Sequence, residues 1–223
     1  MFTVKRPVLS ILGLGRHRHA YLYGSSFQGL DRPHHDAQTE GMKRILAPLF
    51  AIGFLAASSV AQAALPMGAT APEFSTTGAK AGKEVDFDLK QALKRGPVVL
   101  YFYPKAFTQG CTLEAHAFAE ATPEFAELGA TVVGMSADDL PTLKKFSTEA
   151  CRDKFAVAVA TPKIIKEYDV ALARDGKPQG MADRVSYVID QSGKVVFIHS
   201  DLDYRDHVKM TLAAVKVLAK KRP

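Results

Sequence analysis

Residues 98–111 read VVLYFYPKAFTQGC. The first six, Val98 to Tyr103, form a continuous apolar run rich in β-branched and aromatic residues, which is typical of a central strand covered on both faces. Pro104 ends this run, and a short loop leads to Cys111. The stretch therefore predicts a buried strand, a tight connection and a cysteine at the start of the next element.

The residues that follow predict a parallel α/β unit. A helix is expected over residues 111–128, ended by Gly129. Pro123 is expected to divide it into two pieces, with Thr122 capping the second. Residues 131–135 (TVVGM) have the composition of a second buried strand. A strand, a helix and a strand at this spacing predict a right-handed parallel crossover.

The remainder of the chain continues this alternation. The apolar pattern predicts a helix from about Asp139 to Asp153, with Cys151 at the margin of its apolar stripe. A short helix over 162–168 and an antiparallel hairpin of 185–189 and 195–198 are expected next. The chain is expected to close with a helix whose buried stripe is Val208, Leu212, Val215 and Leu218. Residues 65–81, rich in Gly, Pro, Ala and Thr, are expected to be irregular. This order of elements predicts a thioredoxin-like α/β fold, with a mixed central sheet flanked by helices.

A signal-peptide pattern covers residues 42–63. A Lys-Arg pair precedes a mostly apolar run, residues 45–60, and a small-residue cleavage site that ends at Ala63. A membrane anchor is the alternative, but the run is shorter than the ~20 residues that a spanning helix needs. We expect cleavage after Ala63 and a mature domain of residues 64–223. Because a signal normally starts its chain, residues 1–41 are interpreted as an upstream extension from a mis-assigned start.

The positive charge is concentrated before the mature domain. The chain has a formal net charge of +6, with 29 Lys and Arg against 23 Asp and Glu. Residues 1–63 hold seven of the basic and three of the acidic residues, so the mature domain has a net charge of only +2. No basic stripe interleaved with aromatic residues remains, which argues against a nucleic-acid-binding function.

Cys111 and Cys151 are the two cysteines of the chain. In an oxidising compartment, two cysteines pair by default in one structural disulfide. The alternative is catalytic, because a thiolate is the attacking form of cysteine and the unpaired N–H groups of a helix's first turn stabilise it. Cys111 is expected in such a turn. Thr108 would cap the helix or direct its hydroxyl at the sulfur, and Gly110 would permit close backbone approach.

The stretch YFYPKAFTQGCTLEAHAF, residues 101–118, resembles the peroxiredoxin signature Pro-x-x-x-Thr/Ser-x-x-Cys through Pro104, Thr108 and Cys111. It is similar to the bacterioferritin-comigratory, or peroxiredoxin Q-like, branch, and the similarity extends over residues 71–217. The resemblance implies a thiol peroxidase that needs no cofactor and no metal. Cys111 would attack hydrogen peroxide or an organic hydroperoxide and become a sulfenic acid.

The same resemblance assigns two further residues. Residues 184–190 (RVSYVID) are similar to a late strand of the family that begins at the active-site arginine. Arg184 is thereby implied to stabilise the thiolate and polarise the peroxide, and a surface salt bridge is its alternative role. Glu114 resembles the acidic residue that holds this arginine, although an acidic residue in a helix's first turn is also favoured by the helix dipole.

The chain departs from the family at the second cysteine. Many members of the branch have a cysteine five residues after the first, and this chain has His116 there. Cys151 is then the candidate that condenses with the sulfenic acid, forming an intramolecular disulfide that a thioredoxin-like or other thiol reductant would reduce. A one-cysteine enzyme, in which Cys151 is an apolar structural residue, remains the alternative.

Two other classes of function remain open. A thioredoxin-fold module for metal binding or copper delivery would use Cys111 and His116, although such modules usually carry two closely spaced cysteines. A catalytically silent binding module should have lost Cys111 or Arg184. A disulfide carrier is disfavoured because the chain lacks Cys-x-x-Cys. We expect a periplasmic or otherwise exported monomer or weak dimer, without stable membrane association after signal cleavage.

Overall fold

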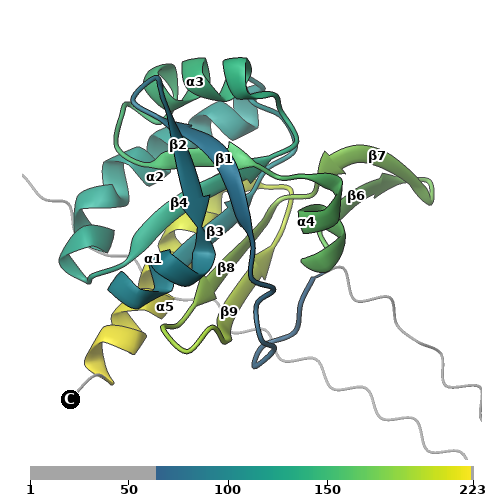
Figure 1. Cartoon of the computed structure of the whole chain (residues 1–223). Coiled ribbons are helices and arrows are strands. Elements are labelled where there is room, and N and C mark those ends of the chain that lie inside the picture. The colour runs from purple at the N-terminus through teal and green to yellow at the C-terminus, as the bar shows by residue number, and fades with distance from the viewer. Residues whose placement is uncertain (1–63, 222–223) are drawn as a thin grey trace, which may run out of the picture. The chain divides into compact units, whose positions relative to one another are not determined.

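The computed structural model describes residues 64–221. The signal peptide predicted at residues 42–63 and the extension predicted at 1–41 lie outside the described residues. The described part forms a seven-stranded mixed sheet in the order β2-β1-β5-β4-β3-β8-β9, with helices on both faces (Figure 1). This architecture confirms the predicted α/β class.

The elements have the following bounds. The strands are β1 (Ser75–Lys80), β2 (Lys83–Asp88), β3 (Val98–Phe102), β4 (Thr131–Ser136), β5 (Ala156–Val159), β6 (Ala171–Arg174), β7 (Lys177–Ala182), β8 (Val185–Ile189) and β9 (Val195–Ser200). The helices are α1 (Leu89–Arg95), α2 (Gln109–Glu127), α3 (Leu140–Glu149), α4 (Pro162–Glu167) and α5 (His207–Lys220), with a 3-10 turn at Tyr204–Asp206. Strands β6 and β7 form a separate hairpin that projects from the main body in Figure 1.

Strand β3 lies inside the sheet, and all five of its residues are buried. It pairs in parallel with β4, where Leu100 lies opposite Val133, and antiparallel with β8, where Leu100 lies opposite Tyr187. Strand β8 pairs antiparallel with β9. The predicted parallel unit and the predicted hairpin are therefore both confirmed, and β3 is the strand that joins them.

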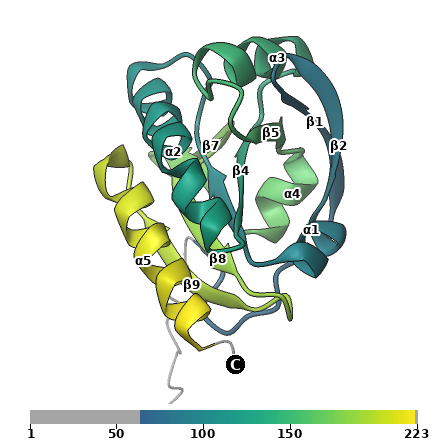
Figure 2. The same ribbon diagram turned by 90° about the vertical axis from the view of Figure 1, so that its left-hand side faces the viewer.

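Alternating side chains of β3 divide the interior into two layers. Leu100 and Phe102 belong to one buried cluster together with residues of α1 and α4. Val99 and Tyr101 belong to the other, with residues of α2, α3 and α5. Figure 2 shows α2 and α5 side by side, away from α1 and α4. Each large apolar side chain that is fully buried stabilises the fold by about 1.5–3 kcal/mol, so both layers contribute substantially.

The expectation that residues 65–81 are irregular is wrong, because β1 begins at Ser75. This strand pairs with both β2 and β5. Gly78 fits tightly between its neighbours, since a Cβ there would lie 2.4 Å from the carbonyl oxygen of Val157. At Gly78 the small residue is thus required by close packing within a strand.

The predicted division of the helix at Pro123 is also wrong, because α2 continues through it. Thr122 does not cap a second helix: its hydroxyl donates to the carbonyl of Phe118 at 2.8 Å, within the same helix. Phe118 and Phe125 are fully buried on either side of the proline. Their packing holds the helix together although Pro123 lacks an N–H for the helical ladder.

Helix α3 ends at Glu149, earlier than predicted, and Cys151 lies in the turn beyond it. Arg152 and Asp153 follow with φ values of +50° and +62°, which a right-handed helix does not allow. Cys151 is fully buried. Its predicted place at the margin of an apolar helical stripe is therefore wrong.

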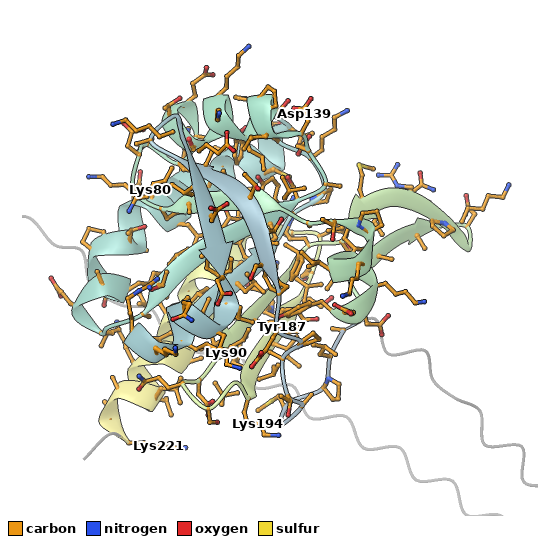
Figure 3. The ribbon with its side chains drawn as sticks, viewed as in Figure 1. Lys80, Lys90, Asp139, Tyr187, Lys194 and Lys221 are labelled. Atoms are coloured by element: carbon orange, nitrogen blue, oxygen red, sulfur yellow. The ribbon has the colours of Figure 1, made fainter. Side chains whose placement is uncertain are left out.

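The closing helix and the surface charge complete the description. Val215 is buried as predicted, and Val208, Leu212 and Leu218 pack against the same cluster while partly exposed. Among residues 64–221, no helix is long and apolar enough to cross a bilayer. Figure 3 labels four lysines that lie on different segments of the domain: Lys80, Lys90, Lys194 and Lys221.

Candidate active site at Cys111

Cys111 lies in the first turn of α2, just beyond the end of β3. The helix begins at Gln109 with Thr108 at the N-cap position, and the amide of Thr112 donates to the Thr108 carbonyl at 2.9 Å. Cys111 is the third helical residue, where backbone N–H groups have no helical partner. Its side chain is only 2% exposed. The loop and the helix start therefore hold the thiol in a nearly closed position.

The hydroxyl of Thr108 does not have either predicted role. It donates to the carbonyl of Lys105 at 3.0 Å and makes no capping bond to the helix. Because a hydroxyl has one proton, it cannot donate to the sulfur of Cys111 at the same time. In this conformation Thr108 stabilises the loop that precedes the helix.

Arg184 lies against Cys111. Its Nη2 donates to Cys111 Sγ at 3.3 Å, its Nη1 pairs with Glu114, and its Nε donates to the carbonyl of Leu202 at 2.9 Å. Arg184 immediately precedes β8, whose first residue, Val185, lies opposite Phe102 at the end of β3. The antiparallel pairing thus brings the arginine to the loop that carries the cysteine.

Glu114 lies one turn after Cys111 on the same helix and is fully buried. Its Oε2 forms the buried ion pair with Arg184. Burial raises the pKa of Glu114 to about 8, although the Arg184 guanidinium opposes this shift. The structure therefore brings together Cys111, Glu114 and Arg184, three of the residues singled out in the sequence.

Sequence reasoning missed the anchor of the Cys111 loop. Oδ2 of Asp138, just after β4, accepts hydrogen bonds from the amide of Ala106 at 2.7 Å and from the hydroxyl of Ser136 at 2.9 Å. Phe107, next in the loop, has a φ of +63°. Its ring packs edge-on against that of Phe146, with the ring centroids 5.2 Å apart. The one available signal was that Asp138 follows a parallel strand adjacent to β3.

Pro104 ends β3 as predicted and is half-buried. It lines a cavity of about 200 Å³ together with Lys105, Asp138 and residues of β7. The proline therefore shapes the loop between β3 and the Cys111 helix, where it is next to the Asp138 anchor.

Cys151 is a free thiol in the same buried cluster as Cys111, which is also free. Burial, and secondarily the charge of Asp153, raises the pKa of the Cys151 thiol far above its ordinary value. The hydroxyls of Tyr101 and Tyr103, on the same face of β3, are buried and have no hydrogen-bond partner within the described residues. Cys151 is therefore held as a protonated, unreactive thiol in this conformation.

The predicted alternative of a metal module has no cluster to support it. Within residues 64–221, no group of three or more His, Cys, Asp or Glu side chains comes together as potential ligands. His116 is half-buried on α2, five residues beyond Cys111. Two side chains alone do not make the four-ligand set that a structural zinc site uses.

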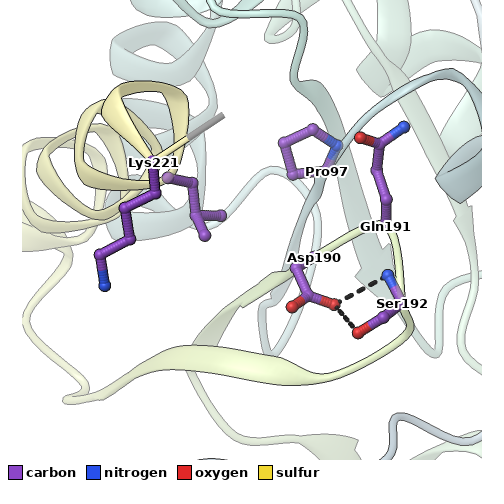
Figure 4. Close-up of a pocket in the computed structure, with 6 residues that line it drawn as sticks. Pro97, Asp190, Gln191, Ser192 and Lys221 are labelled. Atoms are coloured by element: carbon purple, nitrogen blue, oxygen red, sulfur yellow. Dashed lines mark hydrogen bonds between the residues drawn. The ribbon is translucent and has the colours of Figure 1, made fainter. Parts of the chain in front are cut away.

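A separate surface hollow lies at the other end of the sheet. Figure 4 shows its lining, which includes Pro97 before β3 and Lys221 after α5, around a volume of about 230 Å³. Asp190 Oδ1 accepts from the amide of Ser192 at 2.9 Å and from its hydroxyl at 2.6 Å. This carboxylate is engaged in its own turn, so the hollow has no reactive group comparable with Cys111.

Comparisons with known proteins identify relatives of this chain. Residues 67–198 match the model of the AhpC/TSA family. The chain is 32% identical over 152 residues to a chloroplastic peroxiredoxin Q of Oryza sativa subsp. japonica, covering 68% of this chain and 67% of that one. It is 31% identical over 126 residues to peroxiredoxin Bcp of Bacillus subtilis (strain 168), covering 56% and 80%.

The fold comparison gives the same family. The crystal structure of peroxidoxin BcpB from Mycobacterium tuberculosis superposes with a TM-score of 0.61 and 31% identity, covering 69% of this chain and 98% of that chain. The described fold is therefore the thioredoxin-like fold of the peroxiredoxins. By sequence and by fold, the chain belongs to the AhpC/TSA family, in its peroxiredoxin Q and Bcp branch.

Proposed function

We propose that this protein is a thiol-dependent peroxidase that reduces hydrogen peroxide and organic hydroperoxides at Cys111. The observation that carries the proposal is the 3.3 Å contact between Arg184 Nη2 and Cys111 Sγ in a nearly closed site. A guanidinium there favours the thiolate and offers donors to a peroxide oxygen. The family membership supports the same chemistry.

The reaction is a two-electron oxidation of sulfur. The Cys111 thiolate attacks one peroxide oxygen, an S–O bond forms and the O–O bond breaks. The other oxygen leaves as hydroxide or alkoxide and takes up a proton from solvent, which gives water or an alcohol, and the cysteine becomes a sulfenic acid. Nη2 of Arg184 lies 3.3 Å from Cys111 Sγ, beside the place where negative charge moves from sulfur to oxygen, which is the electrostatic basis of the proposed rate enhancement.

In the second step, the Cys151 thiol condenses with the sulfenic acid, which releases water and forms an intramolecular disulfide. We expect this step to need local opening, because a disulfide needs Cα atoms within roughly 7 Å and the two free thiols lie on different segments, the first turn of α2 and the turn after α3. Residues with positive φ lie near each cysteine: Phe107 before Cys111, and Arg152 and Asp153 after Cys151. Each disfavours the closed conformation by about 1–2 kcal/mol, so these segments are suited to open.

A thioredoxin-like or other thiol reductant would return the disulfide to two thiols. The pattern at residues 42–63 supports an exported, periplasmic location, where a cytoplasmic donor is not directly accessible. We propose that the enzyme works as a monomer or weak dimer.

The assay is stopped-flow oxidation of the reduced protein by hydrogen peroxide and by an organic hydroperoxide, with peroxide consumption measured in parallel. We expect rapid oxidation and stoichiometric loss of peroxide, with the new oxygen trapped on Cys111 and identified by peptide mass spectrometry. Oxidation no faster than that of a small free thiol would overturn the proposal.

A further inference from the structure

A buried polar cluster surrounds the carboxyl of Glu114. It also contains Ser186, on β8, and His207, the first residue of α5, and none of the three side chains is exposed to solvent. The cluster therefore joins three elements that are far apart in the sequence. Neither Ser186 nor His207 has a part in the chemistry described so far.

The hydrogen bonds of His207 fix its neutral tautomer. Its Nε2 lies 2.8 Å from the carbonyl oxygen of Asp201, which can only accept, so Nε2 carries a proton. Its Nδ1 lies 2.8 Å from the hydroxyl of Ser186 and 3.7 Å from Oε1 of Glu114. The basic nitrogen of the ring is therefore directed toward the serine and the carboxyl.

Glu114 has one oxygen that is not satisfied. Oε2 pairs with Arg184, whereas Oε1 is buried and has no hydrogen-bond partner within the described residues. An ionised oxygen left in this way is costly, because its hydration is lost and nothing replaces it. Nδ1 of His207, at 3.7 Å, is too far from Oε1 for a hydrogen bond but close enough for its charge to matter. A proton on either atom makes the Glu114–His207 pair neutral and so removes the cost of an uncompensated buried charge.

The charge balance leads to the same arrangement. Arg184 faces two groups that can be anions, the Cys111 thiolate and the Glu114 carboxylate. One guanidinium cannot neutralise two anions in a site that excludes water. If Glu114 and His207 hold one proton between them, that pair is neutral wherever the proton lies. The positive charge of Arg184 is then left for the thiolate.

We propose that His207 is a positioning residue of the peroxidatic site, which shares one buried proton with Glu114 and so keeps the charge of Arg184 available to Cys111. The pKa values support one proton on the pair near neutrality, because burial lowers that of His207 to about 4 and raises that of Glu114 to about 8. The other ionisable groups near His207 are His199 on β9, with ring centroids 4.4 Å apart, Asp201 and Asp203 after β9, and Arg184.

The protonation of the pair can be observed without any activity. On the reduced full-length protein at pH 7, nitrogen NMR reports the state of His207, and infrared spectroscopy reports a protonated carboxyl, assigned by its loss in Glu114→Gln. We expect one proton on the pair, seen as a protonated carboxyl or as an imidazolium. An ionised Glu114 beside a neutral His207 overturns the proposal.

A kinetic experiment rests on the proposed function and tests the consequence for Cys111. His207→Gln keeps a polar side chain that cannot take up a proton. We expect its second-order rate of oxidation by hydrogen peroxide to fall at least about tenfold at pH 7, with the pH profile moved upward. Thr211→Val is the matched control, since the Thr211 hydroxyl is also buried on α5 and donates only to carbonyls of that helix.

A rate and pH profile of His207→Gln equal to those of Thr211→Val would contradict the proposal. An inactive wild-type protein would instead refute the peroxidase function, and the spectroscopic result on the Glu114–His207 pair would still stand or fall by itself.

Discussion

The guanidinium of Arg184 donates a hydrogen bond to Sγ of Cys111 at 3.3 Å, across 73 residues of sequence. The pairing of β3 with β8 sets the two residues side by side. The guanidinium is fixed at two further points, by the carbonyl of Leu202 and by Glu114. Its orientation, and not only its charge, is therefore determined by the fold.

This geometry predicts that Arg184→Lys is a damaging change. A lysine keeps the positive charge but lacks the planar fork that reaches Cys111, Glu114 and Leu202 together. We expect the rate of oxidation by hydrogen peroxide to fall by about ten- to a hundredfold in stopped-flow measurements. Arg95→Lys, on the exposed end of α1, is the control and should match the wild type. Equal rates for both variants would show that the fork has no catalytic role.

Cys111→Ser should abolish peroxide consumption. A serine hydroxyl is not ionised near neutral pH, and Cys151 is buried with a strongly raised thiol pKa, so no second nucleophile is ready to replace it. The measurement is peroxide loss in the presence of excess reductant. Circular dichroism checks that the variant is folded. Turnover close to that of the wild type would refute the assignment of Cys111.

The fold was predictable where local patterns decide it. The run before Pro104, the helix whose first turn holds Cys111 and the β8–β9 hairpin are all visible in short stretches of sequence. Strand β1 was not, because its small residues reflect contact with β5, as at Gly78, and not a loop. The predicted division of α2 at Pro123 was wrong for a similar reason, because the packing of buried phenylalanines on both sides keeps the helix continuous.

The site was predictable only in part. Pro104, Thr108 and Cys111 lie within one short stretch, and the family resemblance added Glu114 and Arg184. The only signal for Asp138 was its position after the strand next to β3, and nothing in the sequence set Ser186 or His207 beside Glu114, because they reach it through the packing of other elements. Whether a histidine on the last helix lies beside Glu114 depends on the whole tertiary structure.

Asp138→Ala should loosen the Cys111 loop. The carboxylate accepts from the Ala106 amide and the Ser136 hydroxyl, and its loss leaves both donors without this partner. We expect the variant to lose about 1–2 kcal/mol of unfolding free energy. Amide hydrogen exchange should become faster in residues 104–110. Asp138→Asn keeps an acceptor oxygen, so its unfolding free energy and its exchange rates should lie between those of Asp138→Ala and the wild type. Unchanged exchange in Asp138→Ala would mean that the loop is held by other contacts.

Cys151→Ser should leave the oxidation of Cys111 by peroxide unchanged. It should alter what the resulting sulfenic acid reacts with next. Peroxide treatment of the wild type is expected to give a disulfide between Cys111 and Cys151, detected by peptide mapping. The serine variant should accumulate sulfenic acid and proceed more readily to sulfinic acid. If Cys151 stays reduced while turnover with a small thiol continues, the enzyme uses one cysteine and Cys151 is a buried structural residue.

The Glu114–His207 pair predicts an unusual dependence of stability on pH. Folding raises the pKa of Glu114 from 4.5 to about 8, so its contribution is complete below pH 4.5 and is lost as pH rises to about 8. Folding lowers the pKa of His207 from 6.5 to about 4, so its contribution is complete above pH 6.5 and is lost as pH falls to about 4. Between pH 4.5 and pH 6.5 the two groups change the free energy of unfolding in opposite directions. Above pH 6.5 only the contribution of Glu114 still changes with pH.

We therefore expect the free energy of unfolding to fall by about 2 kcal/mol between pH 6.5 and pH 8 because of Glu114, at about 1.4 kcal/mol per pH unit. Urea titrations at pH 5, 6.5 and 8, in a Cys111→Ser background that removes ionisation of this thiol, measure the effect. Adding Glu114→Gln should remove the fall above pH 6.5 and leave a loss of stability toward acid, caused by His207. Adding His207→Gln should instead give a continuous fall from pH 5 to pH 8. If Glu114→Gln retains the slope of its parent above pH 6.5, the carboxyl is already ionised in the folded protein and does not hold the buried proton.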